Sequence, residues 1–237
     1  QAQVRAEPAN ARLRVFLFQL LAVLGQWGRA LNQLQVAGEL DAGSLAMVNT
    51  YREALRCEVL RAEVFAGARS PLIFGDPEQW LALLLEALRL TAQGRHSESQ
   101  ALRAEAFALA PTTGGSVDGA PCAWLADADA RLGPVLEAIV NGRYYWIPLQ
   151  RVRQIRVEAP VDLRDLVWAP AHLAWANGGD AVALIPTRYP GSESSEDPQL
   201  RMARKTDWIA QPAELYLGLG QRMLASDTGE YPLLEIR

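Results

Sequence analysis

The segment Pro134-Val-Leu-Glu-Ala-Ile-Val-Asn-Gly-Arg-Tyr-Tyr-Trp-Ile-Pro148 indicates how the second half of this 237-residue chain folds. Two runs rich in β-branched and aromatic residues flank Asn141-Gly142, and Asn-Gly between such runs is the strongest short signal for a β-hairpin. The pattern recurs at Asn177-Gly178-Gly179, between residues 171–176 and 181–185. It recurs again at Asp227-Thr228-Gly229, between residues 221–225 and 231–236. The sequence therefore predicts three antiparallel hairpins.

Outward from these hairpins, a further strand is expected at residues 155–158, with short helices at 149–153 and 163–167. Residues 122–237 are predicted to form one α+β domain with a strongly curved, mostly antiparallel sheet. With enough curvature, such a sheet would be barrel-like. Residues 111–121 are rich in Gly, Thr, Ser and Pro, as linkers are, so the domain boundary is placed there.

The first half has the period of helices. Apolar residues recur at helical spacing over residues 13–24, 27–40, 44–65, 78–93 and 96–109. Gly25 and Gly94 lie between paired helices, 69 residues apart, and Pro8 and Ala42 lie 34 apart at expected helix ends. A period of about 34 residues is that of the tetratricopeptide repeat (TPR). Residues 1–111 are therefore predicted to form a TPR-like helical repeat domain, although the third helix is longer than a standard unit.

The first residues allow two interpretations. If Pro8 ends a repeat, Gln1–Glu7 is the tail of a helix whose partner lies upstream, because half a repeat cannot bury its apolar face. The alternative is that Gln1–Glu7 is a frayed terminus.

Charge and hydropathy argue against several partners, and the densest basic clusters are small: Arg151, Arg153 and Arg156, then Arg201, Arg204 and Lys205. The net charge is −4 and the pI is about 5.3, whereas nucleic-acid binders need a basic face. The longest apolar run, residues 80–90, contains Glu86 and Arg89 and is too short to cross a bilayer. The polar first residues lack the apolar core of a signal peptide. We expect a cytoplasmic protein that binds neither nucleic acid nor membrane.

Metal and cofactor motifs are missing from the sequence. Cys57 and Cys122 stand apart and belong to no C-x-x-C pair, which favours reduced, buried thiols. His96 and His172 have no H-E-x-x-H spacing. Gly218-x-Gly220 lacks the third glycine of a dinucleotide fingerprint, and a bend or bulge in a strand is the favoured interpretation. We expect no metal and no cofactor.

Asp127 and Asp129 are the candidate catalytic pair. Alternation along a strand would place both carboxylates on one face, as hydrolysis or metal binding requires. Carboxylates beside an arginine such as Arg131 more often form structural ion pairs or turn caps. Catalysis by this pair is kept as the alternative hypothesis, and no catalytic residue is assigned.

The second half resembles a known family. The strings that carry the resemblance are residues 124–137, 141–148, 162–168, 175–179, 185–191, 218–222 and 227–232. They are similar to the signature of the ImpE/TagJ (SciE-type virulence protein) family of type VI secretion accessory proteins, whose pattern extends further upstream.

This resemblance implies a non-enzymatic adaptor. It implies binding of the N-terminal helix of the small, TssB-type sheath subunit. It also implies a link to sheath assembly or to sheath disassembly, the latter indirectly through a ClpV-type ATPase. A purely structural subunit is the third hypothesis. The sequence itself leaves open the oligomeric state and the contacting residues.

Residues 80–90 are the candidate contact site. Trp80, Leu83, Ala87 and Leu90 form one helical stripe, and Leu81, Leu84 and Leu88 form a second. One stripe is enough for a repeat's own core, so the second is predicted to bind a partner helix, with Val15 and Gln19 on the same concave face. The alternative is that a neighbouring helix or the C-terminal half covers the second stripe.

Overall fold

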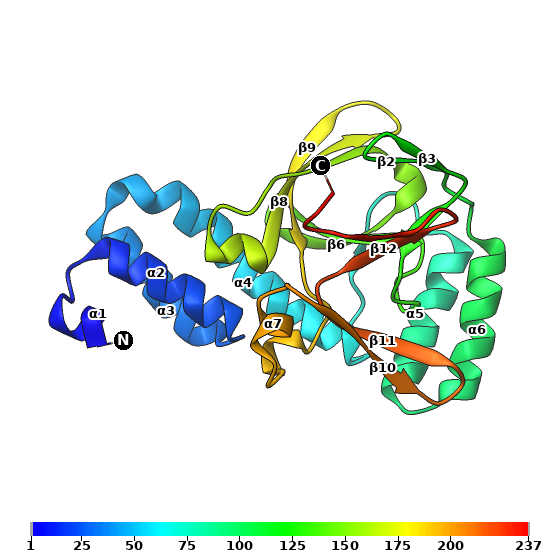
Figure 1. Ribbon diagram of the computed structural model, residues 1–237, viewed down its shortest axis with the longest axis horizontal. Helices are drawn as coiled ribbons and strands as arrows, with labels where there is room; N and C mark the ends of the chain where they lie inside the picture. Colours follow the sequence, from blue (N-terminus) through cyan, green and yellow to red (C-terminus); the bar gives the residue numbers. More distant parts are fainter. Residues whose placement is uncertain (1, 237) are drawn as a thin grey trace.

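The structure is a computed structural model, and it describes residues 2–236 of the chain (Figure 1). The five long helices predicted from the sequence are confirmed, and two short helices, the first and the last in chain order, are added to them. They are α1 (Ala2–Ala6), α2 (Ala11–Val23), α3 (Trp27–Leu40), α4 (Leu45–Phe65), α5 (Gln79–Ala92), α6 (His96–Leu109) and α7 (Pro198–Arg201). Gly25 and Gly94 adopt positive φ, 65° and 75°, at the turns between paired helices. None of the helices within residues 2–236 has the length and hydropathy needed to cross a membrane.

A six-stranded sheet forms the centre of the molecule, in the order β1-β6-β5-β9-β8-β7. Its strands are β1 (Leu72–Ile73), β5 (Val135–Val140), β6 (Arg143–Pro148), β7 (Val152–Val157), β8 (Trp168–Trp175) and β9 (Asp180–Pro186). Only β1 runs parallel to its neighbour. The β5–β6 hairpin turns at Asn141 and Gly142 with φ of 50° and 72°, because a type I′ turn needs two residues with positive φ. The predicted hairpins are confirmed.

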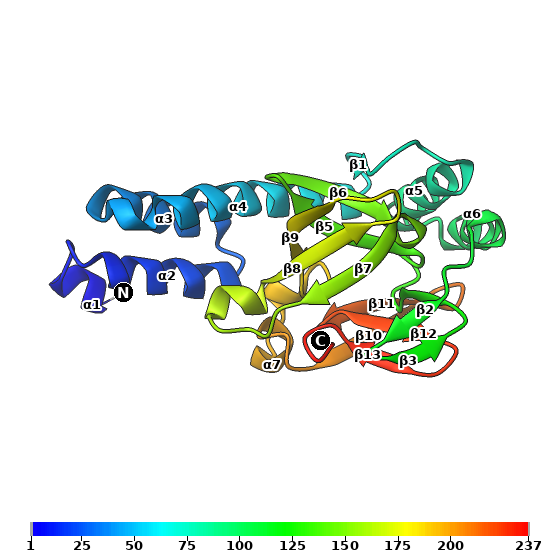
Figure 2. The ribbon, with the colours of Figure 1, turned by 90° about the horizontal axis from the view of Figure 1, so that it is seen from above.

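The barrel-like arrangement was wrong. β1 and β7 are the edges of the large sheet, so it stays open. The later strands form separate small sheets that pack against it instead of joining its ladder. These strands are β2 (Gly115–Val117) with β3 (Ala120–Cys122), β10 (Thr206–Gln211) with β11 (Leu215–Gly220), and β4 (Leu125–Asp127) with β12 (Met223–Ser226) and β13 (Glu230–Pro232). Figure 2 shows β10–β13 on the side of the large sheet away from α4.

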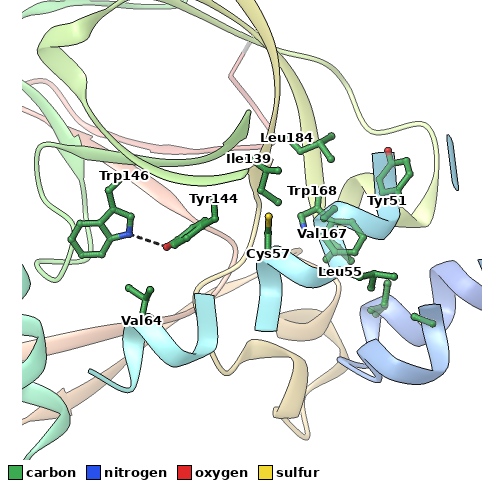
Figure 3. Close-up of a cluster of buried hydrophobic side chains, with 14 of the residues drawn as sticks. Tyr51, Leu55, Cys57, Val64, Ile139, Tyr144, Trp146, Val167, Trp168 and Leu184 are labelled. Carbon is green, nitrogen blue, oxygen red and sulfur yellow. Dashed lines mark hydrogen bonds between the residues drawn. The ribbon is translucent and has the colours of Figure 1, made fainter. Parts of the chain in front are cut away.

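The helices do not form a continuous stack of repeats. The hairpins α2–α3 and α5–α6 have the predicted form, but they lie at opposite ends of the molecule (Figure 1). The 21-residue α4 connects these ends and packs on the sheet. Figure 3 shows Tyr51, Cys57 and Val64 of α4 directed at the sheet residues Tyr144 and Trp168. A helix that covers a sheet cannot also provide the next layer of a repeat, so the TPR-like prediction is not supported.

The two halves share one hydrophobic core. Leu84 of α5 and Tyr51 of α4 lie in the same cluster as Ile139 and Trp168 of the sheet. The helical half also contributes β1 to the large sheet, and the predicted linker contains the β2–β3 hairpin. The division into domains 1–111 and 122–237 stays a prediction, because extensive packing joins them.

Candidate functional site

The structure does not bring the predicted partner-binding residues together. Leu81, Leu84 and Leu88 of α5 are 1%, 0% and 3% exposed, and all three belong to the shared core. Gln19 is also buried, Val15 is half-buried, and both lie on α2, at the far end of the molecule from α5. The prediction of one concave face was wrong, because α6 and the shared core use both stripes of α5.

An exposed apolar stripe lies instead along α2 and its C-cap residue Leu24. Phe16, Leu20 and Leu24 follow one another at four-residue intervals and are 50%, 37% and 41% exposed. The opposite face of α2 is buried, with Phe18 and Ala22 at 0% exposure. Residues four apart share one face of a helix. α2 therefore has one apolar face in the core and a second apolar face that is exposed, the double pattern that the sequence had suggested for α5.

A buried ionic cluster lies where α4 meets the sheet and the C-terminal strands. Its centre is the carboxylate of Glu137 on β5, which is fully buried. The Nε of Arg61 on α4 donates to Glu137 Oε1 at 2.7 Å, and the Arg61 Nη2 donates to Oε2 at 3.1 Å. The guanidinium of Arg222 and the hydroxyl of Tyr144 also donate to this carboxylate. Glu137 thus connects three segments of the chain.

The cluster continues through the candidate catalytic residue Asp127. The Arg222 Nη1 donates to Asp127 Oδ2 at 2.6 Å, and the Tyr189 hydroxyl donates to Oδ1 at 2.9 Å. The backbone N–H of Asp129 donates to Oδ1 at 2.9 Å, which caps a turn. Every oxygen of this carboxylate therefore has a donor from within the fold.

Asp129 is occupied in the same way. The Arg131 Nε lies 2.9 Å and 3.0 Å from its two carboxylate oxygens, and the N–H of Gly218 on β11 donates to Oδ2 at 2.8 Å. Among residues 2–236 no three His, Cys, Asp or Glu side chains are grouped to hold a metal ion. The ion pairs and turn caps expected as the structural alternative are what these carboxylates form.

The two central carboxylates differ in pKa for a physical reason. Burial raises the pKa of Asp127 to about 6, because the single guanidinium of Arg222 only partly offsets desolvation and Asp129 adds repulsion. Burial also disfavours ionised Glu137, but Arg61 and Arg222 together outweigh it and lower that pKa to about 2. The pKa of Cys57 is raised to about 12 by burial, so its thiol stays protonated.

Sequence reasoning missed this cluster. The one signal was Glu137, a charged residue inside the otherwise apolar run Val-Leu-Glu-Ala-Ile-Val. A strand buried along its whole length tolerates a carboxylate only when cations and donors surround it. The partners Arg61 and Arg222 lie 76 and 85 residues away, so no local pattern indicates them.

The fold and the site together define an α+β protein with an ionic cluster in its core and an uncovered apolar helix face. The chain belongs to the ImpE family: residues 119–237 match the family described as ImpE protein. It is 56% identical, over all 237 residues and 83% of the relative, to the type VI secretion system accessory component TagJ of Pseudomonas aeruginosa PAO1. The resemblance drawn from the sequence is confirmed.

A solved structure has the same fold. The crystal structure of protein VPA1032 from Vibrio parahaemolyticus superposes with a TM-score of 0.90. The match covers 100% of this chain and 88% of that one, at 22% sequence identity. This likeness shows the architecture alone.

Proposed function

We propose that this chain is a cytoplasmic, non-enzymatic accessory adaptor of a type VI secretion system, and that it binds the N-terminal helix of a TssB-type sheath subunit. The family membership and the TagJ relative support the secretion role. The observation that carries the binding role is the α2 stripe of Phe16, Leu20 and Leu24. An amphipathic helix binds to such a stripe through apolar anchors at one-turn spacing.

The stripe is large enough for modest affinity. Complete burial of a Leu or Phe side chain is worth about 1.5–3 kcal/mol, and these three are already roughly half buried, so each adds about 1 kcal/mol. The anchors of the partner helix add their own burial, and association costs several kcal/mol of lost freedom. We expect micromolar binding, about −8 kcal/mol. A link to a ClpV-type ATPase then follows indirectly, through the sheath subunit.

The experiment is calorimetry with a synthetic peptide of that N-terminal helix. Leu20→Asp should weaken binding at least about tenfold, because it places a charge in the contact. Leu109→Asp is the matched control, since Leu109 is 49% exposed on α6, at the other end of the molecule. Both variants should keep the helical content and melting temperature of the parent.

Three outcomes separate the parts of the proposal. If both variants weaken binding equally, or if neither variant weakens it, the contact does not lie on α2. A parent protein that binds no peptide at all would remove the TssB-type partner. When the peptide binds the parent protein, calorimetry should give a negative heat-capacity change, because apolar surface is buried.

A further inference from the structure

An open strand edge borders a cleft on the side of the sheet formed by β7. Within residues 2–236, β7 is the last strand of the large sheet, and β2 is paired only with β3. Between β7 and the β2–β3 hairpin lies a cleft of about 560 Å³. Its floor is apolar, formed by Leu136, Leu149, Leu224 and Leu233. Residues of β7 and β2 thus border one cleft with an apolar floor.

The backbone of β7 presents hydrogen-bonding groups to this cleft. The N–H of Glu158 donates to Pro170 O on β8 at 2.9 Å, so the N–H of Glu158 points toward β8. Along an antiparallel strand, the backbone N–H and C=O groups of successive residues point alternately toward one neighbour and toward the other. Ile155 is three residues before Glu158, so its N–H and C=O point away from β8. Ile155 is part-exposed and lines the cleft, whereas Val157 is only 3% exposed and marks the closed end of the edge. The accessible edge runs over Arg153–Arg156.

Two side-chain features indicate the chemistry of an occupant. Arg153 lines the cleft, Arg156 is exposed on the same strand, and within residues 2–236 neither forms an ion pair, so β7 itself is positively charged along this edge. Asp118, the carboxylate in the cleft wall, already has an interaction of its own. The hydroxyl of Thr113 in the cleft wall is buried and has no hydrogen-bond partner among the described residues. A bound chain with acidic side chains outside and apolar side chains inside would complement the arginines and the floor.

We propose that this cleft binds an extended acidic–apolar segment of another protein, which adds a strand to β7. In strand addition, backbone hydrogen bonds supply affinity, and alternate side chains enter pockets. A second copy of this chain is a poor occupant, because antiparallel pairing of β7 with itself would set arginines against arginines. The cleft is separate from the α2 stripe, so this inference stands independently of the proposed function.

The experiment begins with selection of phage-displayed random nonapeptides on the full protein. Enriched peptides should alternate apolar and polar residues, with Asp or Glu at the polar positions. One enriched peptide is then synthesised, together with an analogue N-methylated at alternate amides, which cannot pair with a strand. The analogue should bind about tenfold more weakly or worse, because each lost hydrogen bond reduces affinity.

Variants of the protein test the same contact. Ile155→Pro removes the outward-pointing N–H of residue 155, which makes no hydrogen bond to β8, so the pairing of β7 with β8 is kept. Ile155→Val is its matched control. The double variant Arg153→Glu, Arg156→Glu should weaken the acidic peptide about fivefold or more, and should bind a peptide with Lys in place of its acids. Leu20→Asp should leave peptide binding unchanged.

Hydrogen exchange on the unaltered protein gives a readout that needs no variant. The amide of Ile155 should exchange rapidly in the free protein and become protected when the peptide is bound. Absence of alternating acidic peptides among the selected sequences would overturn the proposal. So would equal binding of the N-methylated analogue, which would mean that the cleft takes apolar side chains without strand pairing. In that case the bulge at residues 152–154 and the arginines only protect the edge from aggregation.

Discussion

Replacement of Glu137 by Gln tests whether the buried ionic cluster holds the two halves together. The substitution keeps the size of the side chain and removes its charge. Arg61 then retains Glu58, at 3.4 Å, and Arg222 retains Asp127, at 2.6 Å. Two guanidinium groups that are at most 6% exposed then share two carboxylates in place of three, and each loses its hydrogen-bonded contact with the charge of Glu137.

The expected loss is large. Removing one partner from a buried ion pair typically costs about 3–5 kcal/mol, because the remaining charge stays desolvated. A domain of this length loses roughly 2–4 °C of melting temperature per kcal/mol, so the midpoint should fall by about 6–20 °C. That loss is a substantial fraction of the roughly 5–15 kcal/mol that stabilises a typical domain.

Urea unfolding followed by tryptophan fluorescence and thermal unfolding followed by circular dichroism measure this loss. Glu86→Gln is the matched control, since Glu86 pairs with Arg89 on the surface of α5 at 2.5 Å with both side chains over 40% exposed. The control should unfold like the parent. An E137Q loss below about 1 kcal/mol, the size of an ordinary substitution, would refute the reasoning.

Three further predictions rest on single side chains. The pKa of Asp127 is raised to about 6 from its ordinary 3.8. The stabilisation that this group contributes is therefore complete below the ordinary pKa and falls by up to about 3 kcal/mol as pH rises through 6. Urea unfolding between about pH 4 and 8 should show that the free energy of unfolding depends less on pH in Asp127→Asn than in the parent. The same pH dependence in both proteins would contradict this. A Cβ on Gly218 would lie 2.3 Å from the buried ring of Tyr189, so Gly218→Ala should cost about 1–3 kcal/mol in thermal unfolding, whereas Gly115→Ala, with open space around it, should not. Leu84→Ala should lower the free energy of unfolding by about 2–5 kcal/mol by leaving a core cavity, while the affinity for the sheath-subunit peptide stays unchanged. Lost affinity with unchanged stability would support the contact on α5 that the sequence predicted.

Local chemistry explains the predictions that succeeded. Asn141-Gly142 identifies its hairpin because few residues adopt positive φ easily, and this preference acts within four residues. The β10–β11 hairpin escaped prediction for the converse reason. It turns at Ala213 and Glu214 with φ of 61° and 53°, a conformation that neither residue type signals. The strand position of Gly218 was predicted, but the ring of Tyr189 that requires a glycine there was not.

The amino-acid sequence by itself determined the helices, the Asn-Gly hairpins and the family, because each depends on spacing or on strings of neighbouring residues. Tertiary structure alone decided which apolar stripe is covered, since α2 and α5 carry similar patterns and only packing buries Leu84 and exposes Leu20. It also decided that Glu137 meets Arg61 and Arg222. Burial and charge pairing are properties of the space around a side chain, and segments distant in the sequence supply that space.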